Sequence, residues 1–100
     1  MPYSVRYKRA AAAEVETAVS RYAQPEINKA PEFVKDLERT ESYLRTQPAL
    51  YQRIDKDIHR AVLRRFPYSL FYVIEQDQVI VLAFMHQHQK ALRREELIKH

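Results

Sequence analysis

The sequence contains no cysteine. Thiol catalysis, disulfide cross-links and cysteine-ligated zinc are therefore excluded for this chain. Small domains in oxidising compartments commonly use disulfides for stability, so a cysteine-free chain of 100 residues is typical of a reducing compartment. We expect a cytoplasmic protein.

Glycine is absent as well. Average usage of about 7% would place several glycines in a chain of this length. Loops that cradle phosphates, such as GxGxxG and GxxxxGK, need glycine for their backbone conformation and for the close approach of the ligand. Dinucleotide binding and P-loop nucleotide binding are thus excluded, and we expect no cofactor.

Long hydrophobic runs are also missing. The longest apolar run, from Val79 to Met85, is far shorter than the roughly 20 residues that a membrane-spanning helix needs. The N-terminal stretch MPYSVRYKRAAAAEV lacks the apolar core of a signal peptide. We expect a soluble protein that is not secreted and has no membrane partner.

Hydrophobic periodicity predicts a short strand followed by two helices. Apolar and polar residues alternate over residues 3–8, which is typical of a strand. Apolar residues then recur at helical spacing over residues 9–23, and Pro25 ends this helix. The second helix begins near Asn28 or Pro31 and continues to about residue 45.

The second half of the chain predicts three strands. In residues 57–66, apolar residues alternate with charged and small ones. Residues 70–74 and 79–85 are nearly continuous apolar runs rich in Val, Ile and aromatic residues. Residues 75–78 form the turn between the last two strands. In the absence of glycine, Asp77 is expected to take the positive φ that such a turn requires.

The expected fold class is therefore α+β, in one domain spanning residues 1–100. An N-terminal strand precedes an antiparallel two-helix hairpin, which packs on an antiparallel β-sheet in the order β-α-α-β-β-β. The apolar sides of the two helices need such a surface to cover.

The charge of the chain is positive, with 17 Lys and Arg against 13 Asp and Glu and a net charge of +4. This balance suits an acidic or polyanionic partner, or it belongs to a merely basic soluble protein. Antiparallel pairing of the last two strands would bring Arg64 and Arg65 to the same end of the sheet as residues 86–90. These residues would form a cationic rim there. The alternative is a solvated surface with salt bridges to the helices.

The stretch RRFPYSLFYVIEQDQVIVLAFMHQ, from Arg64 to Gln87, resembles the signature hairpin of the RelE/ParE superfamily of toxins from type II toxin–antitoxin systems. AAAAEVETAVSRY, PEFVKDL and LRTQPALYQRIDKDIHRAVL fall where that family has its two helices and the following strand, so the resemblance covers about residues 3–91. It implies the family's fold, a cognate antitoxin and growth arrest. RelE-like members cleave messenger RNA on the ribosome, whereas ParE-like members, among them plasmid stabilisation proteins, poison DNA gyrase.

Two positions favour the ParE-like branch. Tyr68 matches a tyrosine common to both branches, but Ser69 stands where RelE-like nucleases resemble one another in carrying an arginine. Gln89 stands where a further catalytic arginine is expected, and an amide cannot neutralise a phosphorane charge. The segment after His86 also departs from the ParE-like pattern, with Gln89, Ala91 and Arg94 at its characteristic positions.

The resemblance and the charges together indicate the site. Arginines make bidentate, charge-assisted bonds to carboxylates, so they suit the acidic or amphipathic tail of an antitoxin. The residues expected to bind an antitoxin or a target are Arg60, Arg64, Arg65, Lys90, Arg93 and Arg94. If the protein is a nuclease, the candidate catalytic residues are Tyr68, His86, His88 and Arg64. No metal site is expected, because no third ligand is evident beside His86 and His88.

The expected function is that of a ParE-like toxin that binds an essential target, DNA gyrase, without catalysis. The first alternative is a RelE-like ribosome-dependent mRNA endoribonuclease in which His86 or His88 replaces the missing arginine chemistry. The second is a degenerate, non-toxic module that retains antitoxin binding.

Overall fold

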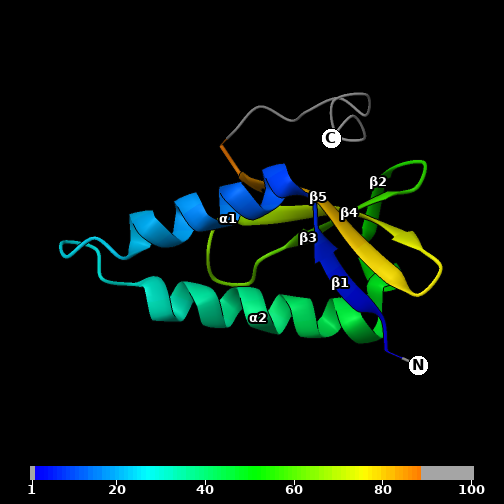
Figure 1. The fold of residues 1–100 in the computed structure, drawn as a ribbon, viewed down its shortest axis with the longest axis horizontal. Coiled ribbons are helices and arrows are strands. Elements are labelled where there is room, and N and C mark those ends of the chain that lie inside the picture. Colours follow the sequence, from blue (N-terminus) through cyan, green and yellow to red (C-terminus); the bar gives the residue numbers. More distant parts are fainter. Residues whose placement is uncertain (1, 89–100) are drawn as a thin grey trace.

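The fold of residues 2–88 is described by a computed structural model (Figure 1). Two helices lie between a first strand and four later ones. In chain order the elements are β1 (Ser4–Tyr7), α1 (Arg9–Tyr22), α2 (Ala30–Thr46), the short 3₁₀ helix η1 (Pro48–Leu50), β2 (Gln52–Asp55), β3 (Ile58–Val62), β4 (Tyr68–Glu75) and β5 (Gln78–His86).

The sheet has the strand order β1-β5-β4-β3-β2. The last four strands pair antiparallel in sequence order, whereas β1 pairs parallel with β5. The predicted α+β fold is confirmed, with two differences in detail: the sheet is mixed, and β2 is an additional strand. Alternation predicts a strand at residues 3–8 but carries no information on its direction, because direction depends on the distant partner strand.

The helix boundaries follow from prolines and from one positive φ. α1 ends at Tyr22, shortly before Pro25. Asn28 takes a φ of 52° in the connection, a conformation that asparagine tolerates better than most residues. α2 begins at Ala30, with Pro31 in its first turn, where its missing N–H costs no helical hydrogen bond. Both helices thus lie within a residue or two of their predicted limits.

The β4–β5 hairpin turns through Gln76 and Asp77. The residue with positive φ is Gln76, at 56°, so the prediction of Asp77 was wrong. Which central residue takes positive φ depends on the type of the turn, and the sequence alone does not fix this type.

The strand predicted over residues 57–66 is shorter than expected. β3 ends at Val62, which is 52% exposed, and the chain then forms a loop over residues 63–67. Phe66 therefore packs on the core from this loop rather than from a strand. The loop leaves the sheet because Asp36, a buried carboxylate of α2, accepts hydrogen bonds from its backbone.

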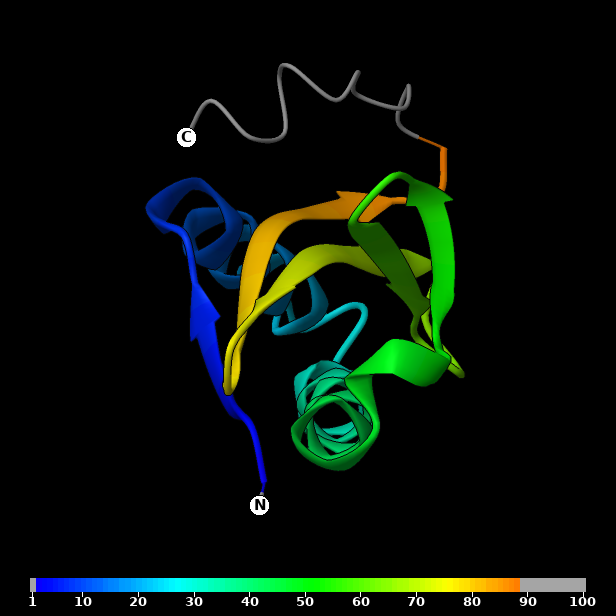
Figure 2. The same cartoon turned by 90° about the vertical axis from the view of Figure 1, so that its right-hand side faces the viewer.

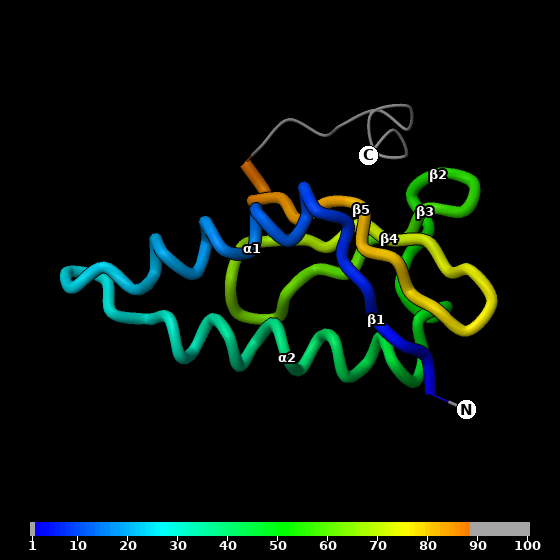
Figure 3. The backbone as a smooth tube through the Cα atoms, viewed as in Figure 1, coloured from blue at the N-terminus to red at the C-terminus, as the bar shows by residue number. Residues whose placement is uncertain are grey.

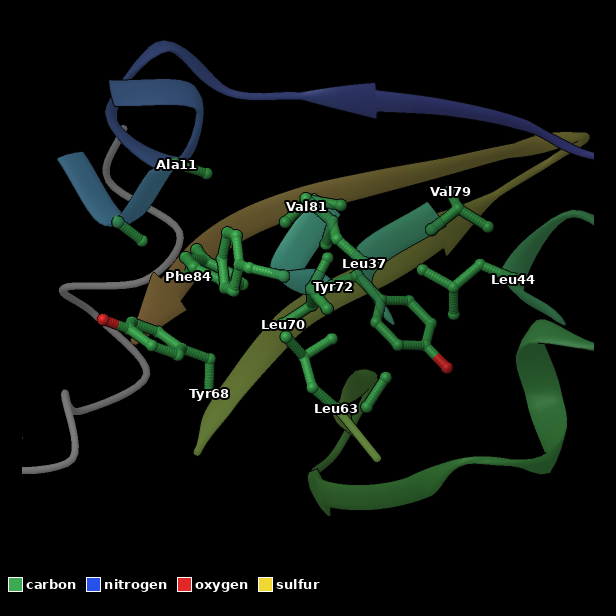
Figure 4. Close-up of a cluster of buried hydrophobic side chains, with 13 residues drawn as sticks. Ala11, Leu37, Leu44, Leu63, Tyr68, Leu70, Tyr72, Val79, Val81 and Phe84 are labelled. Carbon is green, nitrogen blue, oxygen red and sulfur yellow. The ribbon is translucent and has the colours of Figure 1, made fainter. Parts of the chain in front are cut away.

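Both helices cover the same face of the curved sheet (Figure 2). Figure 4 shows the core between them, with the hydroxyls of Tyr68 and Tyr72 at opposite ends of the cluster. A bulge at Leu82 places Val81 and Phe84 on this helical face although they are three residues apart. A second buried cluster lies on the opposite face and consists of Ile58, Phe71, Val73, Ile80, Leu82, Ala83 and Met85.

Five aromatic rings join the helices to the sheet at one end of this core. Phe33 of α2 stacks on Tyr22 of α1 with a centroid distance of 5.1 Å. Its ring also meets the edges of Phe66, Tyr68 and Phe84 at 5.4 to 6.0 Å. Such contacts add to the burial of apolar area, so this aromatic cluster links both helices to the sheet.

The phenols of Tyr7, which is partly buried, and of Tyr72, which is fully buried, predict an alkaline limit to stability. Burial, and for Tyr7 its hydrogen bond to Glu41, raises both pKa values above the usual value near 10. Because the folded state holds these protons more tightly than the unfolded chain, their stabilisation is present below about pH 10 and decreases as the pH rises further.

We expect phenolate absorbance to reach its full value only when circular dichroism reports unfolding. Tyr7→Phe and Tyr72→Phe should each remove one late-titrating phenol. Complete ionisation of all tyrosines in the folded protein would contradict this expectation.

Candidate functional site

The loop between β3 and β4 presents Arg64 and Arg65 to solvent, and Asp36 of α2 holds it in place. The Oδ2 atom of Asp36 accepts hydrogen bonds from the backbone N–H groups of Arg65, at 2.8 Å, and of Phe66, at 3.0 Å. Its Oδ1 atom lies 3.4 Å from Arg39 Nη2. The tube in Figure 3 shows this loop running beside α2. A single buried carboxylate therefore holds the backbone of the loop that carries both arginines.

These residues line a cavity of about 520 Å³, which we call the arginine cavity. Its lining residues are Glu32, Lys35, Asp36, Arg39, Arg64 and Arg65. Because the Asp36 carboxylate is already engaged by the loop backbone and by Arg39, the cavity presents an excess of positive charge. It suits carboxylates or phosphates of a partner.

A second cavity, of about 400 Å³, lies between α1 and the adjoining ends of β4 and β5. We call it the histidine cavity, and it is lined by Glu14, Thr17, Ala18, Arg21, Tyr68, His86 and His88. Arg21 Nη1 donates a hydrogen bond to the hydroxyl of Tyr68 at 2.9 Å. A cation from α1 is thus held in the lining of the cavity by a residue of the sheet.

The two histidines are held against each other. The ring of His86 meets the Tyr68 ring edge-on at 5.0 Å, and the His86 and His88 ring centroids are also 5.0 Å apart. The backbone N–H of His88 donates to His86 Nδ1 at 3.1 Å. Three of the candidate catalytic residues, Tyr68, His86 and His88, are therefore brought together.

The fourth candidate, Arg64, lies in the other cavity. The β4–β5 register and the hydrogen bond from Gln87 N–H to the Pro67 carbonyl place the loop and the histidines at the same end of the sheet. However, the two groups line different cavities, and Tyr22, Phe33 and Phe66 pack at this end of the core. The predicted rim is divided into two sites.

Two further predicted positions lie on the opposite face of the sheet. Arg60 pairs with Phe71 of the second buried cluster, and its Nε is buried without a hydrogen-bond partner in the described part of the chain. The strand predicted over residues 57–66 would have placed Arg60 and Arg64, at spacing four, on one face; this was wrong, because β3 ends before Arg64. Ser69 is buried on this face opposite Met85.

Other predicted residues are not placed. Lys90, Arg93 and Arg94, with Gln89, lie outside the described residues. Within residues 2–88, no three His, Asp or Glu side chains form a group that could hold a metal ion. None of the helices in this range is long and apolar enough to cross a membrane.

Sequence reasoning missed Asp36, Arg21 and Glu14. Asp36 falls on the buried side of α2 between Phe33 and Leu37, and a charged residue at such a position was an available signal for a buried partner. Glu14 and Arg21 share a stripe of α1 at spacing seven, but nothing in this spacing indicates which strand the stripe faces.

Comparisons with known proteins agree with this fold. The family described as "ParE toxin of type II toxin-antitoxin system, parDE" matches residues 5–91. A solved structure titled "Chromosomal ParDE TA system from P. aeruginosa" is similar with a TM-score of 0.69 and 19% sequence identity, covering 84% of this chain and 95% of that chain. No curated protein sequence matches significantly. Since the family match spans most of the chain, the protein belongs to the ParE toxin family of type II toxin–antitoxin systems.

Proposed function

We propose that this toxin arrests growth by binding an essential cytoplasmic target, DNA gyrase, without catalysis of its own. The observation that carries the proposal is the position of Ser69. RelE-like nucleases resemble one another in carrying an arginine there, whereas this serine is buried, pairs with Met85 and lines neither cavity. A hydroxyl in this place cannot neutralise the charge of a phosphorane.

The partner that neutralises the toxin is a cognate antitoxin. The similar solved structure is titled as a ParDE toxin–antitoxin system, and we infer that this chain also has an antitoxin partner. The arginine cavity supports this step, since its excess of positive charge suits the carboxylates of an acidic segment.

The alternative is a ribosome-dependent mRNA endoribonuclease, and the histidine cavity is the observation that favours it. Cleavage through the 2′-hydroxyl needs a base, an acid and a cation for the phosphorane. Histidine is the side chain best suited to the first two roles near neutral pH, and Arg21 would supply the cation that Ser69 cannot. A degenerate module without toxicity is the third candidate.

Assays in which the purified protein is added to gyrase and to translating ribosomes distinguish these candidate functions. We expect inhibited supercoiling or trapped cleaved DNA, and no cuts in messenger RNA at the ribosomal A site. Expression without an antitoxin should arrest growth.

Ribosome-dependent cuts that disappear in His86→Ala and in Arg21→Ala, but persist in a control such as Arg6→Ala, at an exposed position of β1, would establish the nuclease instead. No growth arrest and no effect on either target would indicate the degenerate module.

A further inference from the structure

The second buried cluster lies on the face of the sheet opposite the helices, which we call the outer face. None of its members is more than 8% exposed, and they are Ile58, Phe71, Val73, Ile80, Leu82, Ala83 and Met85. Figure 2 shows that the sheet curves toward the helices, so the outer face is its convex side. Apolar side chains on a convex face are open to water unless another segment lies over them, so the burial of this cluster needs a cover.

The helices of residues 2–88 do not provide this cover. α1 and α2 pack on the other face of the sheet. η1 meets that same face, because the hydroxyl of Tyr72 donates a hydrogen bond to the carbonyl of Pro48. β2 lies at the edge of the sheet, and most of its side chains are exposed. The elements of the described part of the chain thus leave the outer face uncovered.

The chain that follows β5 has the position and the length for this role. β5 ends at His86, directly after Met85 of the outer face, and residues 89–100 follow the described part of the chain. The stretch of β5 from Ile80 to Met85 is about 17 Å long. Residues 89–100 would span about 18 Å as a helix and more in an extended conformation, so they are long enough to cross the outer face.

The sequence of this segment also suits an apolar surface. Residues 91–98 read ALRREELI. On a helix, about one third of the circumference would carry three apolar residues and one carboxylate, which are Ala91, Leu92, Ile98 and Glu95. A helix of this length is marginal in isolation, so it needs a surface on which to pack.

The outer face holds a cation that calls for such a carboxylate. Arg60 of β3 pairs with Phe71 of the cluster, and its Nε is buried without a hydrogen-bond partner among residues 2–88. A buried guanidinium group is stabilised by a carboxylate within reach, through charge-assisted hydrogen bonds. Glu95, on the apolar side of the segment, supplies the matching charge.

We propose that residues 89–100 of the same chain cover the outer face, with Ala91, Leu92 and Ile98 on its apolar residues and Glu95 at Arg60. The segment thereby closes the face on which Ser69 lies. An RNA would have to displace it to reach the position at which RelE-like nucleases resemble one another in carrying an arginine. The inference depends neither on gyrase as the target nor on the antitoxin.

Thermal unfolding of the full-length protein tests whether the segment is packed. Ile98→Asp should lower the melting temperature by about 5–15 °C, because it places a carboxylate against the apolar surface. His100→Asp introduces the same charge two residues later and should shift the melting temperature by less than about 2 °C. Small and equal shifts in the two variants would overturn the proposal.

The absence of cysteine allows a direct test of the location. Lys99→Cys introduces a single thiol for a benzophenone maleimide. Ile27→Cys, at an exposed position in the connection between α1 and α2, is the control. We expect the label at residue 99 to cross-link to β4 or β5 within one molecule, and the label at residue 27 to give no cross-link to these strands. Cross-links that join two molecules would assign the outer face to a second copy of the chain, and cross-links to α1 or α2 alone would place the segment elsewhere; either result contradicts the proposal.

A double-mutant cycle tests the contact between Glu95 and Arg60. Glu95→Gln should lower the melting temperature of the otherwise wild-type protein more than that of an Arg60→Met variant, in which its partner is already gone. The control, Glu96→Gln, should have the same effect in both backgrounds. If Glu95→Gln also acts equally in both, Glu95 does not face Arg60 and the proposed arrangement is wrong.

Discussion

Replacing Asp36 with alanine is expected to lower the free energy of unfolding by about 3 kcal/mol or more. The carboxylate is buried and accepts two backbone hydrogen bonds, from Arg65 and Phe66, in addition to its contact with Arg39. Alanine would leave both N–H groups without their acceptor in a partly buried loop. Each such group carries a desolvation cost of about 1–3 kcal/mol, so the two together account for the expected loss.

Chemical denaturation of the purified protein measures this change. Glu38→Ala is the matched control, because Glu38 is an exposed acidic residue of the same helix, and its substitution should change the free energy by no more than about 0.5 kcal/mol. Asp36→Asn keeps one acceptor oxygen and should fall between the two. A loss below about 1 kcal/mol for Asp36→Ala would show that water satisfies the loop and that Asp36 does not position the arginines.

The parts of the fold that the sequence predicted are those set by local periodicity. The two helices were placed by the spacing of their apolar residues and by Pro25, Asn28 and Pro31, all of which act within a few residues. Strands β4 and β5 were placed by their continuous apolar runs.

The parts that it did not predict depend on distant partners. β1 could have paired on either edge and in either direction, and β2 exists only because β3 folds back on it through Lys56 and Asp57. The bulge at Leu82 likewise depends on pairing with β4.

For the candidate site, the sequence predicted several of the residues but not how they are grouped. Arg64, Arg65, His86 and His88 were found because antiparallel pairing brings the two ends of a hairpin together. Their division between two cavities was not found. Asp36 holds the loop on the side of α2, whereas the Tyr68 hydroxyl meets Arg21 of α1. The Asp36 contact spans 29 positions of the sequence and the Arg21 contact spans 47. Hydrophobic periodicity is a local pattern and cannot predict contacts over such separations.

Reversing both charges at the loop, by Arg64→Glu with Arg65→Glu, is expected to weaken antitoxin binding by about 100-fold or more. In the proposed complex, the substitution would turn two attractive contacts with antitoxin carboxylates into repulsive ones. Like charges juxtaposed in an interface cost several kcal/mol, and about 2.7 kcal/mol corresponds to 100-fold. The remaining complex should also depend less steeply on salt, because salt then screens the two repulsive contacts as well as the attractive ones that remain. Titration calorimetry at low and at high salt measures both effects.

The fold should survive this double substitution, because Asp36 holds the loop through the backbone N–H of Arg65 and not through its guanidinium. Unchanged thermal stability together with lost binding would therefore assign the effect to the interface. Arg6→Glu with Arg9→Glu serves as the control, since it makes the same change of net charge at exposed positions on β1 and α1, outside the arginine cavity. A general effect of net charge would weaken binding in both double variants alike. Antitoxin affinity that stays unchanged at low salt in the Arg64/Arg65 variant would remove these arginines from the binding site.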